Sequence, residues 1–255
     1  MRLEFLGTGT STGVPVIGCQ CETCQSTDRR DNRLRASVIW SVNGYNILVD
    51  PGPDLRIQLL RARATRIDCI LVTHQHYDHV GGLDDVRGLN FSMGQSINVY
   101  AEPIVASAFR HNLSYIFAEN KYPGVPEITL SEIDATSSFF PCEGLEIIPI
   151  RVFHGKLPIV GFRIGNWAYI TDASSIPEES MKALQNLDVL VLNALRIEPH
   201  PSHFSLSESL SIVNELSPKR TYFTHASHHM PLQAVVERTL PDGVRIAYDC
   251  LVIEE

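Results

Sequence analysis

The segment "THQHYDHVGG", residues 73–82, constrains this chain more than any other stretch of it. It follows the apolar run "CILV" and places four potential metal ligands within six positions: His74, His76, Asp78 and His79. Alternate residues of an extended segment face the same side, so His74 and His76 can share one metal ion. The chain then turns into a helix opened by "GGLDD", which aims Asp78 and His79 toward a second ion. The segment therefore predicts one motif that serves two metals.

Further ligands for such a pair are available at the ends of later strand-like runs. His154 follows "IPIRVF", Asp172 follows "AYIT" and His225 follows "TYFT". A single residue of this kind is more often an ordinary loop residue than a ligand. Three ligand-type residues in the same structural position favour a metal site built at strand ends.

Composition and patterning indicate one globular domain over residues 1–255. Hydrophobic residues make up 44% and charged residues 20% of the 255, an ordinary soluble composition. Short β-rich runs alternate with helical stretches, and the Asn43-Gly44 and Gly165-Asn166 turns predict antiparallel neighbours. The strands expected are 2–7, 36–42, 45–50, 69–73, 97–101, 145–152, 162–166, 167–171, 188–193, 220–224 and 244–249. The helices expected are 53–64, 82–91, 103–112, 177–186, 205–215 and 231–239. This order predicts two mixed sheets with helices outside them.

The charge and the N-terminal residues limit the partners. A formal charge of −8 argues against extended nucleic-acid binding, although a local basic pocket remains compatible with it. The start of the chain lacks an apolar signal region, and no run approaches the roughly 18 apolar residues of a membrane span. We therefore expect a cytoplasmic protein that acts on a small molecule without a membrane, and the sequence leaves a homodimer open.

One segment, residues 114–133, departs from the alternation of strands and helices. It contains Tyr115, Phe117, Tyr122 and two prolines. Long irregular loops are functional or merely exposed with similar frequency. The segment is therefore either a lid over a site or a surface loop anchored by its aromatic residues.

The run "HQHYDH", followed by His154, Asp172 and His225, resembles the metallo-β-lactamase superfamily over nearly the whole chain. That resemblance implies an αββα sandwich with a dinuclear site along one edge of its two sheets. It also implies two ligand sets that share a bridging carboxylate: His74, His76 and His154 for one ion, Asp78, His79 and His225 for the other, and Asp172 between them.

The resemblance extends to the surroundings and the chemistry of the site. "ILVDPGPD" resembles an early Asp motif of the family, which makes Asp50 a residue that orients ligand imidazoles. Nitrogen and oxygen ligands suit zinc or manganese equally. Redox relatives carry Glu at the position of His76 to hold iron, so His76 favours hydrolysis.

The stretch "GCQCETC" concentrates three cysteines, Cys19, Cys21 and Cys24, in six positions without a fourth ligand. Tetrahedral zinc needs four. With the histidine three residues after His225, this stretch resembles the phosphoribosyl 1,2-cyclic phosphate phosphodiesterase group, whose structural zinc is held by such a set. The resemblance implies a closed Cys₃His site with His228, in a zinc-binding loop at 18–27, and His229 is an alternative ligand. Three reduced, metal-free cysteines in a loop are the alternative interpretation, which the polar surroundings of the cysteines make the less favoured one.

The same group implies the catalytic roles. A pair of divalent ions clamps the oxygens of a phosphoryl displacement, with Asp78 and Asp172 as catalytic ligands. His203 in "PHPSHFSLSES" matches the general acid of the group, and Lys156 matches a residue that contacts a substrate phosphate. Asn193 and Arg196 depart from its pattern, which leaves the exact substrate open.

Three functions fit the sequence. A metal-dependent phosphodiesterase acting on small cyclic phosphates, such as phosphoribosyl 1,2-cyclic phosphate or a cyclic nucleotide, fits best. It would use two catalytic divalent ions, Mn or Zn, and one structural Zn. A lactone, thioester or tRNA 3′-processing hydrolase on the same fold is the alternative, and the acidic charge counts against the tRNA enzyme. A non-enzymatic zinc-binding module leaves the seven ligand-type residues at strand ends unexplained.

Overall fold

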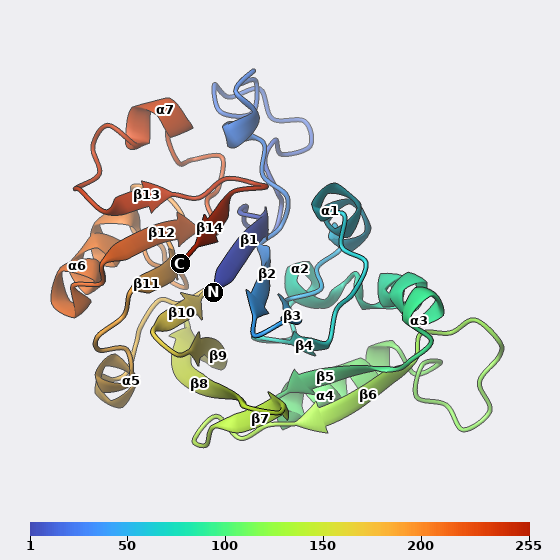
Figure 1. The fold of residues 1–255 in the computed structure, drawn as a ribbon. Coiled ribbons are helices and arrows are strands. Elements are labelled where there is room, and N and C mark those ends of the chain that lie inside the picture. The colour runs from blue at the N-terminus through green and yellow to red at the C-terminus, as the bar shows by residue number, and fades with distance from the viewer.

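Two seven-stranded β-sheets packed face to face form the centre of the molecule (Figure 1). The computed structural model describes all of residues 1–255. The first sheet has the spatial order β14 (Val252–Glu254), β1 (Arg2–Gly7), β2 (Ser37–Val42), β3 (Tyr45–Val49), β4 (Cys69–Leu71), β5 (Ile97–Ala101) and β6 (Ile128–Glu132). The second has the order β13 (Val244–Ile246), β12 (Arg220–Thr224), β11 (Val189–Asn193), β10 (Trp167–Ile170), β9 (Leu157–Ile164), β8 (Leu145–His154) and β7 (Phe139–Cys142).

Helices cover the outer face of each sheet (Figure 1). Those between β3 and β6 are α1 (Leu55–Ala62), α2 (Tyr77–Val80), the 3₁₀ turn η2 (Leu83–Val86), α3 (Arg87–Met93) and α4 (Pro103–Asn112). Those associated with the second sheet are α5 (Glu178–Ala183), α6 (Leu206–Leu216) and α7 (Gln233–Val236), and a short 3₁₀ turn, η1 (Arg29–Asp31), follows β1. The architecture is the predicted αββα sandwich.

The alternation of side chains along each strand builds three apolar layers. In β2, Val38 and Trp40 face the core between the sheets, whereas Ile39 faces the helices. In β11, Val191 faces the same central core and Leu192 faces the layer under α5 and α6. Successive side chains point to opposite faces of a strand, so strands covered on both faces read as continuous apolar runs. Burying each such side chain contributes about 1.5–3 kcal/mol.

Both sheets contain a set of four parallel strands, β3 to β6 in one and β10 to β13 in the other. The hairpins at Asn43-Gly44 and Gly165-Asn166 join β2 to β3 and β9 to β10 as antiparallel pairs, as predicted. The carboxyl ends of parallel strands open at one edge of a sheet, where ligands of α/β proteins commonly bind. His154 ends the antiparallel strand β8, and the other predicted metal ligands follow the parallel strands β4, β10 and β12.

The predicted strands and helices all occur, but five elements lie outside the expectations: β6, β7, β14, α2 and η1. Strands β7 and β14 are short, and α2 is a single turn that precedes the predicted helix at 82–91, which itself divides into η2 and α3. The interpretation of 114–133 as wholly irregular is wrong, because β6 pairs in parallel with β5.

The remainder of that segment forms the loop that projects beyond α3 (Figure 1), with the Tyr115 hydroxyl donating to Asp84 at 2.6 Å. Its function as a lid stays a prediction. None of the helices is both long and apolar enough to cross a membrane.

Candidate metal centres

The motif of residues 74–79 changes conformation between its two halves, as the ligand pattern requires. His74 and His76 lie in extended chain after β4, with His74 Nε2 3.0 Å from His76 Nδ1. Asp78 and His79 belong to α2, whose first helical residue is Tyr77. The turn that redirects Asp78 and His79 is therefore α2 itself, and not the helix opened by "GGLDD". The two pairs thus face different positions, as expected.

Asp172 stands at the centre of the cluster and divides it in two. Its Oδ1 lies 3.3 Å from His79 Nε2 and 3.0 Å from His225 Nδ1. Its Oδ2 lies 3.4 Å from His203 Nε2 and 3.9 Å from His74 Nε2. Each oxygen of the carboxylate thus faces a different group of imidazoles, the arrangement that a carboxylate bridging two ions requires.

The group of Asp78, His79, Asp172 and His225 fits a metal ion closely. Their ligand atoms lie within 4.8 Å of one another, and all four residues are buried. His79 Nε2 is buried without a hydrogen bond, 3.2 Å from Asp78 Oδ2. An unpartnered ring nitrogen among carboxylate oxygens is costly unless a cation occupies the space between them. This group is the ligand set expected for the second ion.

The same carboxylates favour positive charge at His79. Burial alone would lower the pKa of His79, but Asp172, Asp50 and Asp78 together raise it well above its usual range. A metal ion in this position would replace that proton. By contrast, burial lowers the pKa of His225 to about 4, so its imidazole is neutral, the form that coordinates a metal.

The three histidines expected to hold the first ion, His74, His76 and His154, are less closely grouped than the ligands of the second ion. His154 Nδ1 donates to the backbone oxygens of Asp172 at 2.9 Å and Ser202 at 2.8 Å, which leaves Nε2 with a free lone pair. The ring centroid of His154 lies 5.1 Å from that of His76 and 5.8 Å from that of His74. The structure thus gathers the three expected histidines, although His154 lies closest to Asp172 and His203 as a potential ligand group.

Asp50 contacts one half of the cluster directly and the other half through Thr73. Its Oδ2 accepts from His79 Nδ1 at 2.7 Å. It also accepts from the Thr73 hydroxyl at 2.8 Å, and that hydroxyl lies 3.0 Å from His74 Nδ1. Both imidazoles are held with Nε2 directed toward the ligands, because Nδ1 carries the hydrogen-bonded proton. One buried carboxylate therefore orients a ligand of each ion.

Two further orienting residues were missed by the sequence analysis. Thr10 Oγ1 lies 3.1 Å from His225 Nε2, so that Nδ1 of the same ring is free to face Asp172. Asn193 accepts from the Ala173 N–H at 2.7 Å and donates to the Ala173 carbonyl at 2.9 Å, fixing the chain next to Asp172. The "GTGTSTG" stretch after β1 could have suggested Thr10, but nothing in its spacing connects it to His225.

Three site residues have left-handed backbone conformations: Asp50 (φ 60°), Asp172 (φ 60°) and His225 (φ 59°). Each lies at or just after the carboxyl end of a parallel strand. Non-glycine residues pay about 1–3 kcal/mol for such conformations, which persist where the surrounding structure enforces them. The hydrogen bonds of Thr73, Asn193 and Thr10 supply that enforcement here.

His203 lies at the open side of the cluster, just before α6. Its ring stacks on His225 at 5.1 Å and 16°, and its side chain is 12% exposed. Its Nδ1 lies 3.1 Å from Ser202 Oγ and 3.2 Å from His200 Nδ1. His200, which the sequence analysis set aside, thus contacts the expected general acid.

Lys156 lies exposed in the turn between β8 and β9, two residues after His154, and forms no hydrogen bond or ion pair. Contact with a substrate phosphate stays a prediction for this residue.

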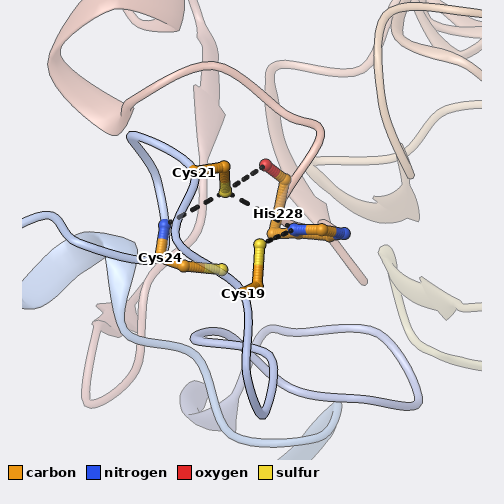
Figure 2. A group of neighbouring side chains, drawn as sticks. All are labelled: Cys19, Cys21, Cys24 and His228. Atoms are coloured by element: carbon orange, nitrogen blue, oxygen red, sulfur yellow. Dashed lines mark hydrogen bonds between the residues drawn. The ribbon is translucent and has the colours of Figure 1, made fainter.

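A second potential metal site lies at the N-terminal loop (Figure 2). The ligand atoms of Cys19, Cys21, Cys24 and His228 lie within 4.8 Å of one another. His228 Nδ1 is 3.2 Å from Cys19 Sγ and 3.5 Å from Cys21 Sγ, and His229 is not part of the group. Four soft and borderline ligands at this spacing fit tetrahedral zinc.

Backbone donors support the sulfur atoms of this site. The Cys24 N–H donates to Cys21 Sγ at 3.4 Å, and the Val16 N–H donates to Cys24 Sγ at 3.3 Å. The first of these is the main reason that the pKa of Cys21 falls to about 6. Thiolate is the form that binds zinc. The four residues are only partly buried, in contrast to the His/Asp group.

Comparison with known proteins identifies the class. Residues 45–226 match the family described as the beta-lactamase superfamily domain, and these residues include the His/Asp cluster. The chain belongs to this superfamily and has the metallo-β-lactamase fold. A crystal structure of a diphosphatase from the PhnP family is more specifically similar, with 42% identity, a TM-score of 0.92, and coverage of 99% of this chain and 97% of that one.

Other relatives are more distant or only partly covered. The chain is 39% identical over 259 residues to the octanoyltransferase of Porphyromonas gingivalis, in a match that covers 100% of the chain and 52% of that protein. It is 30% identical over 168 residues to ribonuclease Z of Geobacillus kaustophilus, covering 64% of the chain and 48% of the relative. The chain spans about half the length of the curated relatives it matches. Zn(2+)-bound PqqB from Methylobacterium extorquens shares the fold, with a TM-score of 0.83 at 21% identity and full coverage of both chains.

Proposed function

We propose that this protein is a phosphodiesterase that hydrolyses small phosphodiesters with two divalent metal ions in the His/Asp cluster. The observation that carries the proposal is the position of Asp172, whose two oxygens face separate groups of imidazoles. Two ions held this way supply Lewis-acid stabilisation of the charge that develops on a phosphoryl group. A cyclic phosphate, such as phosphoribosyl 1,2-cyclic phosphate or a cyclic nucleotide, is the proposed substrate.

The position of His203 supports its proposed role as general acid. Its Nε2 lies 3.4 Å from Asp172 Oδ2, at the partly open side of the cluster. A protonated Nε2 there can deliver its proton to the leaving oxygen of a ribose-type ester, whose alkoxide is otherwise a poor leaving group. The position near His200 and Ser202 Oγ restrains the ring from the other side.

A diphosphate linkage is the second candidate substrate, because the PhnP-family diphosphatase is 42% identical over nearly the whole chain. Both reactions are displacements at phosphorus and use the same charge stabilisation. They differ in the leaving group, because a phosphate departs more readily than an alkoxide and depends less on His203.

The deciding experiment combines metal analysis with a substrate panel. We expect three ions per chain, two in the His/Asp cluster and one zinc in the Cys₃His site, with manganese or zinc in the first two. The panel contains a ribose 1,2-cyclic phosphate, a cyclic nucleotide, a dinucleoside diphosphate, a lactone, a thioester and a precursor tRNA. Hydrolysis confined to the lactone or thioester, or to the tRNA, would overturn the proposal. A fully loaded, active sample with one ion per chain would remove the dinuclear arrangement.

A further inference from the structure

A cavity of about 790 Å³ lies away from both metal centres, between η1, the end of α1 and the chain that joins β13 to β14. It is lined by three arginines, Arg29, Arg30 and Arg61, together with Asn32, Tyr248 and Cys250, and by Asp249. No residue of the His/Asp cluster or the Cys₃His group lines it. Figure 1 shows the segment after β1 lying near α1, where these elements meet. Its volume falls within the range of small-molecule sites.

The region around this cavity is basic in an otherwise acidic protein. Residues 29–66 contain eight arginines, no lysine, no glutamate and three aspartates, whereas the whole chain has a formal charge of −8. Like charges concentrated in one stretch of sequence are usually a solvated surface. Here three of the arginines converge instead on one cavity from two separate elements, η1 and α1.

The three arginines differ in how far the protein neutralises them. Arg30 is fully engaged, donating to Asp28 at 2.7 Å and to Glu237 at 3.2 Å. Arg29 makes no side-chain hydrogen bond or ion pair. Arg61 has only Asp249 at 3.8 Å, and its side chain is half exposed.

Of the other polar groups that line the cavity, some have hydrogen-bond partners within the protein and others have none. Asp249 is occupied by the Thr8 hydroxyl and the Leu34 N–H, each at 2.9 Å. The Tyr248 hydroxyl has no protein partner. Arg29 and the Tyr248 hydroxyl are therefore free to bind a ligand, and Arg61 is held only by its 3.8 Å ion pair. The one carboxylate that opposes an anion, Asp249, is already hydrogen-bonded.

We propose that this cavity binds a small phosphorylated molecule of nucleoside monophosphate size, with Arg29 and Arg61 on the phosphate and Tyr248 against the remainder. Guanidinium groups match the oxygens of a phosphate with paired donors. Tyrosine offers a flat apolar face beside a hydroxyl donor. An extended nucleic acid fits less well, because the acidic charge of the rest of the surface would repel it beyond the cavity.

Cys250 provides a site-specific test, because its exposed thiol lines the cavity. Zinc-loaded protein is alkylated with iodoacetamide in the presence of adenosine 5′-monophosphate or inorganic phosphate, and modification is quantified by peptide mass spectrometry. Cys142, which lies in β7, is the internal reference. We expect adenosine 5′-monophosphate to slow modification of Cys250 at least fivefold at saturation and to leave Cys142 unchanged.

The variant Arg29→Gln/Arg61→Gln should raise the half-protecting concentration at least tenfold, because it removes both guanidinium groups that hydrogen-bond the phosphate. Arg63→Gln is the matched control, since Arg63 is an exposed arginine two residues on that does not line the cavity. Both arginines of the double variant are at the surface, and circular dichroism should confirm its fold. Hydrolysis should be unchanged in both variants, which separates this proposal from the proposed function.

Three results would overturn the proposal. They are the absence of protection by about 10 mM of either probe, equal protection in the double variant, and protection by a single-stranded oligonucleotide alone. The last would instead assign the arginines to a nucleic acid. Protection by phosphate as strong as by adenosine 5′-monophosphate would support the anion site and remove the role of Tyr248.

Discussion

The two ligand clusters of this molecule are built in opposite ways. The His/Asp cluster takes its residues from the ends of strands in both sheets and is mostly buried, whereas the Cys₃His cluster joins one loop to one residue, His228, and is only partly buried. The first is positioned by the sandwich itself. The second spans more than 200 residues of sequence and positions the loop. The strands therefore position the His/Asp cluster, whereas the Cys₃His cluster links the N-terminal loop to a distant segment of the chain.

The hydrogen bonds around each cluster differ accordingly. Side chains orient the imidazoles of the buried cluster: Asp50 holds His79, and Thr10 holds His225. Backbone N–H groups support the sulfurs of the Cys₃His cluster. Side-chain partners can be removed one at a time by substitution, so the buried cluster can be tested residue by residue. The loop cluster is better tested by removing its metal or a ligand.

The largest effect is expected from Asp172→Ala. The variant removes the carboxylate that faces both groups of imidazoles, and turnover should be abolished. The fold should survive, because Asp172 lies in a loop beyond β10 rather than in an apolar layer. Activity and metal content are measured together with circular dichroism. More than a few per cent of residual activity would contradict the bridging role, and the Cys₃His site should keep its zinc.

The next largest effect is expected from His203→Ala, and it depends on the leaving group. A ribose-type cyclic phosphate should be hydrolysed about 10²- to 10⁴-fold more slowly, because its alkoxide needs a proton. An activated aryl phosphodiester, whose phenolate departs unaided, should be affected far less. Metal content should not change. Equal slowing of both substrates with loss of metal would make His203 a ligand, as its position beside His154 and Asp172 allows.

Some residues of the His/Asp site could be predicted from the sequence, and others could not. The spacing of His74, His76, Asp78 and His79 predicted their grouping because a local backbone pattern fixes their directions. The remaining ligands could be placed because apolar strands end just before them. Thr10 and Asn193 could not, because their roles depend on long-range packing between strands that pair only in the folded sheets.

Prediction of the fold from the sequence has the same limit. Two mixed sheets with helices outside them followed from apolar runs and hairpin turns, and the family resemblance implied the αββα sandwich. Strand β6 was missed because it is an edge strand with polar residues and follows two prolines, so its sequence does not indicate a strand. Only its pairing with β5 shows it. Helix α2 was missed because a single turn has no periodicity to detect.

Removal of zinc from the Cys₃His site should reveal a difference in alkylation rate between Cys21 and Cys24. Hydrogen bonding from the Cys24 N–H lowers the pKa of Cys21 to about 6, whereas burial raises the pKa of Cys24 to about 11. In chelator-treated protein at pH 7, Cys21 should therefore be alkylated at least tenfold faster than Cys24.

The pH dependence follows from the sign of that shift. Because the folded pKa of Cys21 lies below its ordinary value of 9.0, its contribution to stability is complete above about pH 9 and is lost as the pH falls from there through about 6. The alkylation rate of Cys21 should fall as the thiolate is protonated around pH 6. Equal rates for both thiols would show that the loop loses its arrangement without zinc.

Cys19→Ser should separate the structural from the catalytic metals. We expect the loss of one ion per chain, a lower melting temperature and a decrease in activity of about tenfold. The link is direct, because the segment after β1 pairs with the segment after β12: the Thr10 N–H donates to the Ala226 carbonyl, next to His225. Cys69→Ser is the control for a cysteine that lies in β4, outside the loop. Unchanged activity after confirmed loss of zinc would show that the loop does not influence the catalytic ligands.

The smallest effect is expected from Thr10→Val, which removes a single hydroxyl while keeping the shape of the side chain. Without the partner at 3.1 Å, His225 Nε2 is left unsatisfied in a buried position, and the ring can turn so that Nδ1 no longer faces Asp172. Loss of such an orienting partner typically weakens metal affinity 10- to 100-fold, and the isosteric change predicts the lower end. Titration of the metal-depleted protein with zinc measures this affinity. Thr12→Val, in the same loop, removes a hydroxyl that bonds only the Gly13 carbonyl and should leave the affinity unchanged. Equal affinities in the two variants would mean that Asp172 and the backbone at His225 position this ring without Thr10, and that the buried cluster depends on its strands alone.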